Sequence, residues 1–368
     1  MHKPKLLFIG ALPPPYIGPS VANQKLIQSP ALNNAFEIIH LDTSDRRNPQ
    51  NIGKMDFGNA LLAIRHISLC LYRLFRWQPE IVYLPLSQGL WGLVRDLGFI
   101  LPAVVLRKKV IAHLRGSEFD QIFVTLPRIV QAMTRWAFRR VSRALVLGNS
   151  VKHLFRGLFP DHKVVVVPNG IDYHPFEPNG AADRRNGILF LSSLLERKGI
   201  FQFLEALPRV FEQYPNLKVT IAGTWQDPGD KKKLDALIAA HKLEQKVRFA
   251  GEVGTKTKIQ LYHHHALFVF PPIQPEGMPW VILEAMSAKL PVITTAQGTI
   301  PEVVEDQQTG FIINPTPENI AEKICYLLEN PDLAMEMGQR GRKRIEAHFS
   351  EEVYFERLKS VFLDALNS

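Results

Sequence analysis

Short, continuously apolar runs alternate with amphipathic stretches along almost the whole chain, and this alternation constrains the fold most. Runs such as KLLFIG (5–10) and KVVVVPNG (163–170) are typical of strands buried on both faces of a parallel sheet. Between the runs lie helical stretches such as GIFQFLEALPRVFEQYP (199–215), with apolar residues three and four positions apart. Because parallel strands need crossover helices, the pattern predicts an α/β protein with doubly wound sheets.

The alternation pauses at residues 174–187, where HPFEPNGAADRRNG is rich in proline, glycine, asparagine and charge. A chain of 368 residues suits two domains, so we place the boundary in this stretch. We expect a first domain over residues 1–178 and a second over residues 179–350. An amphipathic stretch at 351–368 predicts a closing helix that can pack back on the first domain.

The charge of the chain is concentrated in its first half. Residues 1–180 hold 22 Lys and Arg against 11 Asp and Glu (+11), and the remainder holds 22 against 24 (−2), which sums to the formal +9. A basic half favours nucleic acid, an anionic membrane or an anionic substrate. No nucleic-acid-binding motif accompanies it, so nucleic acid is not an expected partner.

Two stretches of the basic half, residues 57–77 and 123–143, mix arginine with aromatic and aliphatic residues. Such helices can rest on an anionic membrane, or they can be core-facing helices with solvated arginines, and the sequence leaves both open. No uncharged run has the length of a membrane span, and Cys70 and Cys325 are far apart. We therefore expect a cytoplasmic protein, peripheral at the inner face of the membrane if these helices bind lipid.

Two glutamates bracket the start of an expected helix in PEGMPWVILEAMSAKLPV (275–292). Pro279 suits the first helical turn, so Glu276 should lie in the preceding loop and Glu284 inside the helix. A loop carboxylate can accept hydrogen bonds from sugar hydroxyls, and a helical one can hold a diol such as ribose. The alternative is a capping acid followed by a surface acid.

Two loops after expected strands can bind an anion. In LSSLLERKGIFQFLEA, Arg197 and Lys198 precede a helix N-terminus, where the helix dipole disfavours cations and a diphosphate would resolve the conflict. A proline-rich loop after the first strand leads to Gly18 and Ser20, and small residues at a helix N-terminus attract anions. Each loop can also be a plain connection, with Ser20 as a helix cap.

Other chemistries find less support. The first strand is not followed by G-x-G-x-x-G, which disfavours a nicotinamide-dependent oxidoreductase. There is no D-x-D pair to hold a cation, so we expect neither a metal nor a cofactor. The run His263–His265 is not expected to bind a metal, because consecutive residues of a helix that leads into a strand point in different directions.

Taken in order, these motifs resemble the retaining glycosyltransferases of family 4, which have the GT-B fold. The resemblance covers nearly the whole chain and is strongest over residues 164–316, with VVVVPNGID, SSLLERKGIFQFLEAL, LKVTIAG, VRFAGEV, EGMPWVILEAM and LPVITTAQGTIPEVVEDQQTGFIINP. It implies two Rossmann-like domains facing a central cleft, the first for the acceptor and the second for a nucleotide-sugar donor. Glu276 and Glu284 match the E-x7-E signature of the family.

The resemblance implies roles for the candidate residues of the second domain. Arg197 and Lys198 would bind the donor diphosphate and stabilise it as it leaves. Glu284 would hold the ribose hydroxyls, and Glu276 would contact the transferred sugar. The sugar pocket would be shaped by Met278, Pro279 and Trp280.

The first domain contributes two further expectations. Gly18 would let its loop approach the diphosphate, with Ser20 beside it. His113, at the end of KVIAHLRG, matches a position where the family often has a histidine near the reacting carbon, although a histidine at a strand end can equally be structural. His113 thus joins Glu276, Arg197 and Lys198 as an expected catalytic residue.

The chain departs from the family pattern at two places. It has Ser192, Ser193 and Leu194 where the family often has Gly-Arg-Leu, so one usual phosphate-binding arginine is missing and Arg197 can take its place. Lys289 stands where a glycine is common. Both departures bear on the identity of the donor more than on the reaction.

The sequence therefore predicts a retaining, metal-independent glycosyltransferase of the hexosyltransferase type. It would move a sugar from a UDP- or GDP-linked donor to a saccharide or lipid-linked saccharide acceptor, as in polysaccharide or glycolipid biosynthesis. For retention, the family's usual proposal is front-face attack in which the leaving phosphate assists deprotonation of the acceptor. The alternative is a non-catalytic protein of the same fold that binds sugar nucleotides or carbohydrate.

Overall fold

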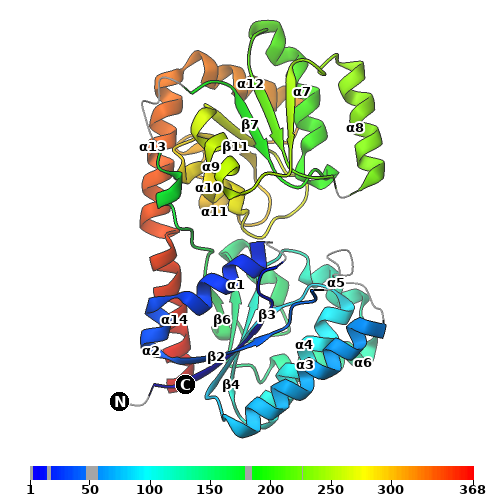
Figure 1. Ribbon diagram of the computed structural model, residues 1–368, viewed down its shortest axis with the longest axis vertical. Helices are drawn as coiled ribbons and strands as arrows, with labels where there is room; N and C mark the ends of the chain where they lie inside the picture. The colour runs from blue at the N-terminus through cyan, green and yellow to red at the C-terminus, as the bar shows by residue number, and fades with distance from the viewer. Residues whose placement is uncertain (1–2, 15–17, 47–56, 179–184, 226) are drawn as a thin grey trace. The chain divides into compact units, whose positions relative to one another are not determined.

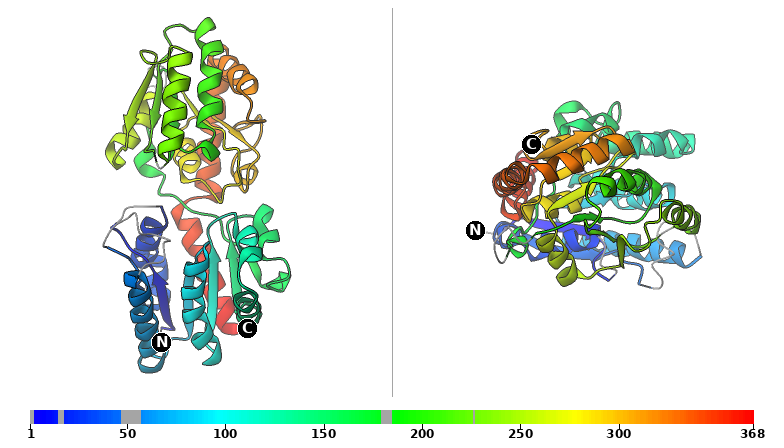
Figure 2. Two further views of the ribbon diagram at one scale, coloured as in Figure 1. Left: turned by 90° about the vertical axis from the view of Figure 1, so that its right-hand side faces the viewer. Right: turned by 90° about the horizontal axis from the view of Figure 1, so that it is seen from above.

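Two compact units make up the computed structural model, which describes residues 3–14, 18–46, 57–178, 185–225 and 227–368 (Figures 1 and 2). Unit 1 comprises Met1–Pro168 and Glu352–Ser368, and unit 2 comprises Asn169–Glu351. Each unit is built on a six-stranded sheet whose neighbouring strands run parallel. The doubly wound α/β fold expected from the alternating pattern is confirmed.

The sheet of unit 1 has the strand order β2-β1-β3-β4-β5-β6. Its strands are β1 (Lys5–Gly10), β2 (Glu37–Asp42), β3 (Ile81–Leu86), β4 (Lys109–Leu114), β5 (Arg143–Val146) and β6 (Val164–Val166). Its helices are α1 (Gly18–Gln28), α2 (Pro30–Ala35), α3 (Phe57–Arg76), α4 (Leu90–Val105), α5 (Phe119–Thr125), α6 (Arg128–Phe138) and α14 (Glu351–Asn367).

Both faces of this sheet are buried, which explains the continuous apolar runs. In β1, Leu7 and Ile9 belong to one hydrophobic core, whereas Leu6 and Phe8 belong to the other. Successive side chains of a strand point to opposite faces, so a strand covered on both sides needs apolar residues throughout.

The C-terminal helix α14 supplies part of one of these cores, and Figure 1 shows it beside the sheet of unit 1. Phe362 is completely buried, and its ring centroid lies 5.3 Å from that of Tyr83 and 5.7 Å from that of Phe36. The neighbouring Leu363 remains 37% exposed. Residues distant in sequence thus complete the core of the first unit.

The sheet of unit 2 has the strand order β12-β11-β10-β7-β8-β9. Its strands are β7 (Ile188–Leu191), β8 (Val219–Ala222), β9 (Val247–Gly251), β10 (Leu267–Phe270), β11 (Val292–Thr295) and β12 (Gly310–Ile313). Its helices are α7 (Ile200–Gln213), α8 (Pro228–Ala240), α9 (Thr255–His264), α10 (Trp280–Ser287), α11 (Ile300–Val303), α12 (Pro317–Glu329) and α13 (Pro331–His348).

The division between the units comes at Pro168, earlier than the boundary we placed after residue 178. Backbone hydrogen bonds explain the difference. The Ile171 N–H donates to the Phe349 carbonyl (2.8 Å), and the Glu351 N–H donates to the Ile171 carbonyl (3.0 Å). Arg342 also donates to the Tyr173 carbonyl, so this segment is attached to the second unit.

No helix in the part of the chain that the structure describes is long and apolar enough to cross a membrane. Cys70 and Cys325 are both buried as free thiols. Burial raises the pKa of the Cys70 thiol to about 12, so this side chain behaves as a small apolar core residue.

If α14 completes the core of unit 1, Phe362→Ala should destabilise that unit. Removing a fully buried phenylalanine costs about 3–5 kcal/mol. Urea unfolding followed by circular dichroism should show this loss, whereas Leu363→Ala should change the free energy of unfolding by less than about 1 kcal/mol. Equal effects of the two substitutions would contradict this packing.

Candidate functional site

The strand order of unit 2 reverses between β7 and β10, and the candidate site lies there. From β7 the chain proceeds outward to β8 and β9, and it then returns to place β10 on the other side of β7. In doubly wound sheets, ligands bind beyond the carboxyl ends of the strands at such a reversal. The loops after β7 and β10 carry Lys198 and Glu276, respectively.

A glycine lets these two loops approach each other closely. Gly199 has a φ of +78°, and a Cβ at this position would lie 1.9 Å from the Pro271 carbonyl oxygen. Only glycine tolerates both this left-handed backbone and this contact. The Ile273 N–H donates to the Arg197 carbonyl (3.0 Å), which joins the loops through the backbone.

Lys198 and Glu276 form an ion pair between the two loops. The Lys198 Nζ lies 2.5 Å from the Glu276 Oε1, and the two side chains are only 14% and 11% exposed. The loop after β11 contacts the backbone of Glu276, because the Thr299 N–H donates to the Glu276 carbonyl (3.3 Å). At Gly298, with a φ of +56°, a Cβ would lie 1.7 Å from that same carbonyl oxygen.

Glu284 lies within α10 and is held by two side chains of α9. The Tyr262 hydroxyl donates to the Glu284 Oε2 (3.0 Å), and the Lys258 Nζ contacts the Glu284 Oε1. Burial, and then the charge of Glu284, raises the pKa of Tyr262 well above its usual value. The phenol therefore stays protonated and fixes the orientation of the carboxylate.

Lys258 and Tyr262 were not among the residues predicted from the sequence. They are four positions apart in TKTKIQLYHH, so they share one face of α9. That spacing is the only sequence signal for them, and it does not indicate which carboxylate the face meets.

The remaining candidates of unit 2 adjoin Lys198 or stand between Glu276 and Glu284 in the sequence. Arg197 precedes Lys198, and within the described residues its guanidinium has no ion pair. Met278 is buried and its carbonyl accepts from the Asn169 Nδ2 (3.2 Å). Pro279 is the N-cap of α10 and Trp280 is its first residue, so the helix begins in the expected place.

The structure places the other three predicted residues in unit 1. Gly18 is the first residue of α1, and Ser20 lies in its first turn, 2% exposed. Residues 15–17 of the preceding loop lie outside the described residues. The proposed approach of this loop to a diphosphate therefore stays a prediction.

His113 lies at the end of β4 and is completely buried. Its Nδ1 lies 2.8 Å from the Tyr83 hydroxyl oxygen, and its Nε2 has no partner among the described residues. Burial, and then the charge of Arg115, lowers the pKa of His113 well below its usual value, which makes the ring neutral. In this structure His113 offers no surface to a substrate.

The histidines of the run 263–265 contact different partners. The His264 Nδ1 lies 2.6 Å from the Gln260 carbonyl oxygen, and the His265 Nε2 lies 2.8 Å from the Thr220 hydroxyl oxygen. Among the described residues, no group of three or more His, Cys, Asp or Glu side chains is arranged to hold a metal ion.

The contact with Lys258 should stabilise the buried Glu284 carboxylate. We expect Lys258→Ala to lower the free energy of unfolding by about 1.5–3 kcal/mol, the usual contribution of a hydrogen bond to a charged group. Lys256→Ala is the matched control, because Lys256 is exposed on the same helix and should contribute less than about 0.5 kcal/mol. Urea unfolding of both variants measures the difference, and equal losses would contradict the assignment.

Residues 175–344 match the family model of the glycosyl transferases group 1. Spore coat protein SA of Bacillus subtilis is 28% identical over 296 residues, which cover 72% of this chain and 78% of the relative. A second relative, from Corynebacterium glutamicum, is 27% identical over 273 residues, which cover 69% of each chain. It is named as a GDP-mannose-dependent monoacylated alpha-(1-6)-phosphatidylinositol monomannoside mannosyltransferase.

Solved structures resemble the whole chain. A glycosyltransferase from Rickettsia africae has a TM-score of 0.75 at 18% identity, covering 100% of this chain and 99% of that one. Anabaena HepE in complex with UDP and glucose has a TM-score of 0.74 at 15% identity, covering 98% and 99%. These likenesses confirm the GT-B fold. The family model and the two relatives support the placement of this chain among the group 1 glycosyltransferases.

Proposed function

We propose that this chain is a retaining glycosyltransferase of family 4 that transfers a hexosyl group from a nucleotide sugar, with unit 2 as the donor-binding unit. The observation that carries the proposal is the pair of shielded carboxylates beside the strand reversal. Glu276 is paired with Lys198, and Glu284 is held by Lys258 and Tyr262. The family match over residues 175–344 includes all five residues.

Donor binding would exchange the partners of Lys198. A diphosphate offers several charged oxygens, whereas Glu276 offers one carboxylate, so the ammonium group should move from Glu276 to the diphosphate. Arg197 would supply a second cation, and the first N–H groups of α7 would supply further donors. Glu276, once released, would accept hydrogen bonds from hydroxyls of the transferred sugar.

Glu284 would hold the ribose of the donor. A carboxylate accepts hydrogen bonds from both hydroxyls of a diol, and the Tyr262 hydroxyl keeps one of its oxygens in a fixed position. Lys258 would compensate the charge that the buried carboxylate would otherwise carry alone. The ribose diol would then add its own donors to a carboxylate that is already oriented.

The transfer step requires stabilisation of the leaving nucleoside diphosphate. The bond between the anomeric carbon and the phosphate oxygen breaks, and the acceptor oxygen bonds to the same face of that carbon. The acceptor proton passes to the leaving phosphate, so atoms and charge balance without a protein nucleophile. Lys198 and Arg197 would stabilise the developing negative charge electrostatically, and we propose that the reaction is metal-independent.

The relatives support a UDP- or GDP-linked donor and a saccharide or lipid-linked acceptor. HepE was solved with UDP and glucose, and the Corynebacterium relative is named as a GDP-mannose-dependent enzyme acting on a phosphatidylinositol mannoside. A capsular polysaccharide biosynthesis glycosyltransferase of Staphylococcus aureus is also similar, at 24% identity. We propose that this chain acts on a polysaccharide or glycolipid precursor.

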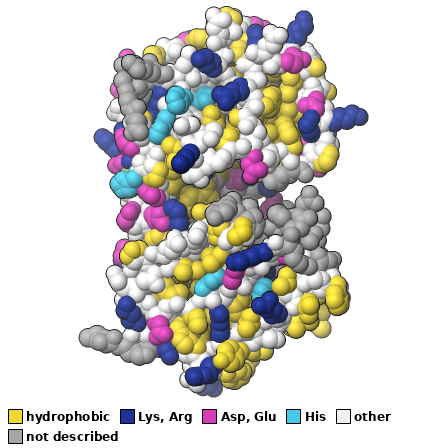
Figure 3. Space-filling model, in the orientation of Figure 1, with side chains coloured by type: hydrophobic (Ala, Val, Ile, Leu, Met, Phe, Trp, Pro, Cys, Tyr) yellow, Lys and Arg dark blue, Asp and Glu magenta, His cyan; other side chains and the backbone are white. Residues whose placement is uncertain are grey.

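The apolar and basic surface of unit 1 supports a peripheral membrane location. Exposed apolar side chains on α3 and on α6 recur at helical spacing, so each helix presents an apolar stripe. The stripe of α3 comprises Phe57, Leu61, Ile64, Tyr72 and Phe75, and that of α6 comprises Ile129, Met133 and Trp136. Both helices contact α4, and Figure 3 shows hydrophobic and basic side chains together in the lower part of the view. Residues 57–76 and 128–143 contain no Asp or Glu, which suits an anionic lipid surface.

Lys198→Ala should weaken donor binding by the protein that remains folded. Calorimetric titration with UDP-glucose and GDP-mannose should show binding of at least one donor to the wild-type chain. We expect a loss of about tenfold or more in the Lys198→Ala variant, because a charge-assisted contact to the diphosphate disappears. Lys232→Ala, on the exposed face of α8, is the matched control and should bind the donor normally.

Turnover separates the enzyme from the non-catalytic alternative. NMR of the product formed with the bound donor should show the anomeric configuration of the donor retained. An inverted product would exclude the retaining mechanism. Donor binding without hydrolysis or transfer to any saccharide or lipid-linked acceptor would instead favour a binding protein of the same fold.

The membrane contact has its own test. We expect the chain to sediment with vesicles that contain phosphatidylglycerol but not with vesicles of phosphatidylcholine alone, and 0.5 M salt should weaken the binding because charges are screened. Ile64→Glu should reduce sedimentation strongly. Phe249→Glu, at an exposed position in unit 2, is the control. Equal losses of sedimentation in the two variants would contradict a membrane-binding surface on unit 1.

A further inference from the structure

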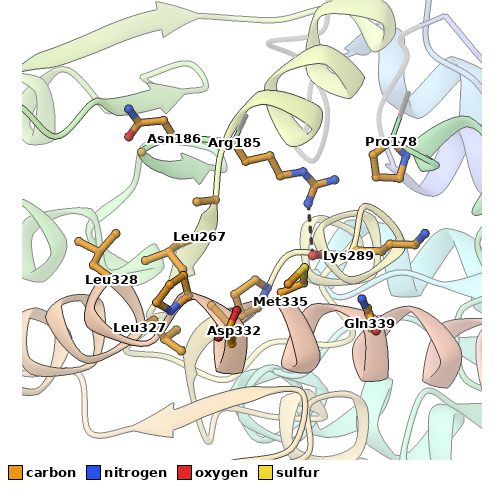
Figure 4. Close-up of a pocket in the computed structure, with 15 residues that line it drawn as sticks. Pro178, Arg185, Asn186, Leu267, Lys289, Leu327, Leu328, Asp332, Met335 and Gln339 are labelled. Atoms are coloured by element: carbon orange, nitrogen blue, oxygen red, sulfur yellow. Dashed lines mark hydrogen bonds between the residues drawn. The ribbon is translucent and has the colours of Figure 1, made fainter. Parts of the chain in front are cut away.

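A cavity of about 590 Å³, shown in Figure 4, lies at the end of the unit 2 sheet where the strands begin. Gly187, Leu267 and Pro291 line it, and these residues stand where β7, β10 and β11 begin. Lys198 and Glu276 follow the carboxyl ends of β7 and β10, so the cavity is separate from the proposed donor site. Its volume falls in the range of about 300–1,000 Å³ that is typical of small-molecule sites.

One part of the cavity is apolar. Leu327 and Leu328 come from α12, Met335 comes from α13, and Leu267 begins β10. Figure 4 shows Leu267, Leu327 and Leu328 grouped on one side of the view, with Arg185, Lys289 and Gln339 on the other. A ligand that fits both sides must combine an apolar body with a polar group.

Arg185 is the cation of this cavity whose hydrogen-bonding capacity is least used. Its Nη1 donates to the Lys289 carbonyl (3.3 Å), and within the described residues it forms no ion pair. Burial lowers the pKa of Arg185, and the charge of Glu177 acts in the opposite direction. A guanidinium has five N–H donors and stays charged, so most of its donors remain available to a ligand.

The charges of the other two ionised residues that line the cavity, Lys289 and Asp332, are already compensated within the protein. Lys289 is paired with Glu177, with its Nζ 2.5 Å from the Glu177 Oε1. Asp332 lies in the first turn of α13, where the helix dipole favours an acid. The nearby Asp332 also disfavours a doubly charged ligand, whereas a single carboxylate matches the guanidinium geometry.

We propose that this cavity binds a small amphipathic anion, with a carboxylate on Arg185 and an apolar body against Leu328 and Met335. The inference goes beyond the glycosyl transfer proposed above and does not depend on it. None of these residues belongs to the proposed donor site.

Calorimetric titration of the full chain with sodium decanoate tests the proposal. We expect one saturable site, and much weaker binding of butyrate, which has the same carboxylate and a shorter apolar body. Arg185→Gln should weaken decanoate binding about tenfold or more, because a charge-assisted pair is lost. Arg248→Gln, an exposed arginine of the same unit, is the matched control and should bind normally.

A second variant tests the cavity without changing Arg185, in case Arg185→Gln weakens binding by disturbing the fold. Met335→Trp adds volume at a partly exposed position on the cavity wall, so it should block decanoate while leaving the thermal unfolding midpoint close to that of the wild type. UDP-glucose or GDP-mannose affinity should be unchanged in both variants. Decanoate binding that persists in Met335→Trp or Arg185→Gln, or that is absent from the wild type, would overturn the proposal.

Discussion

The ion pair between Lys198 and Glu276 is the interaction on which this account of unit 2 depends. Both side chains are largely shielded from water, and removing one partner of such a pair costs about 3–5 kcal/mol because the other charge is left uncompensated. The ion pair therefore helps to hold the two loops together. In the proposed donor complex, Lys198 would leave Glu276 for the diphosphate and free this carboxylate for sugar hydroxyls. Such an exchange would couple recognition of the diphosphate to recognition of the sugar.

The pair forms because of backbone features elsewhere. Parallel pairing of β7 with β10 brings their loops together, and the glycines at 199 and 298 allow contacts that any Cβ would block. Lys289 also has a backbone conformation that favours glycine, although this chain has a lysine there. Its φ is +60°, which explains why a glycine is common there in the family that the sequence resembles. Lys289 is retained here at some cost in strain, and its side chain pairs with Glu177.

Much of the fold could be predicted from the sequence, and the site only in part. Continuous apolar runs predicted parallel strands, and Pro279 located the start of α10, because both signals are local. Lys258 and Tyr262 were missed because their contact with Glu284 joins two helices, which no local pattern encodes. His113 was chosen by its position at a strand end, but only the packing around β4 shows that it is buried against Tyr83. The boundary at Pro168 likewise depends on hydrogen bonds between distant residues, such as Ile171 and Phe349.

The proposed exchange of partners at Lys198 can be tested directly. A crystal structure of the chain with a bound nucleoside diphosphate, UDP or GDP, would locate the ammonium group. We predict that the Lys198 Nζ lies within hydrogen-bond distance of a phosphate oxygen and has separated from the Glu276 carboxylate. A nucleotide bound at the reversal between β7 and β10 with the Lys198–Glu276 pair still intact would contradict the central claim.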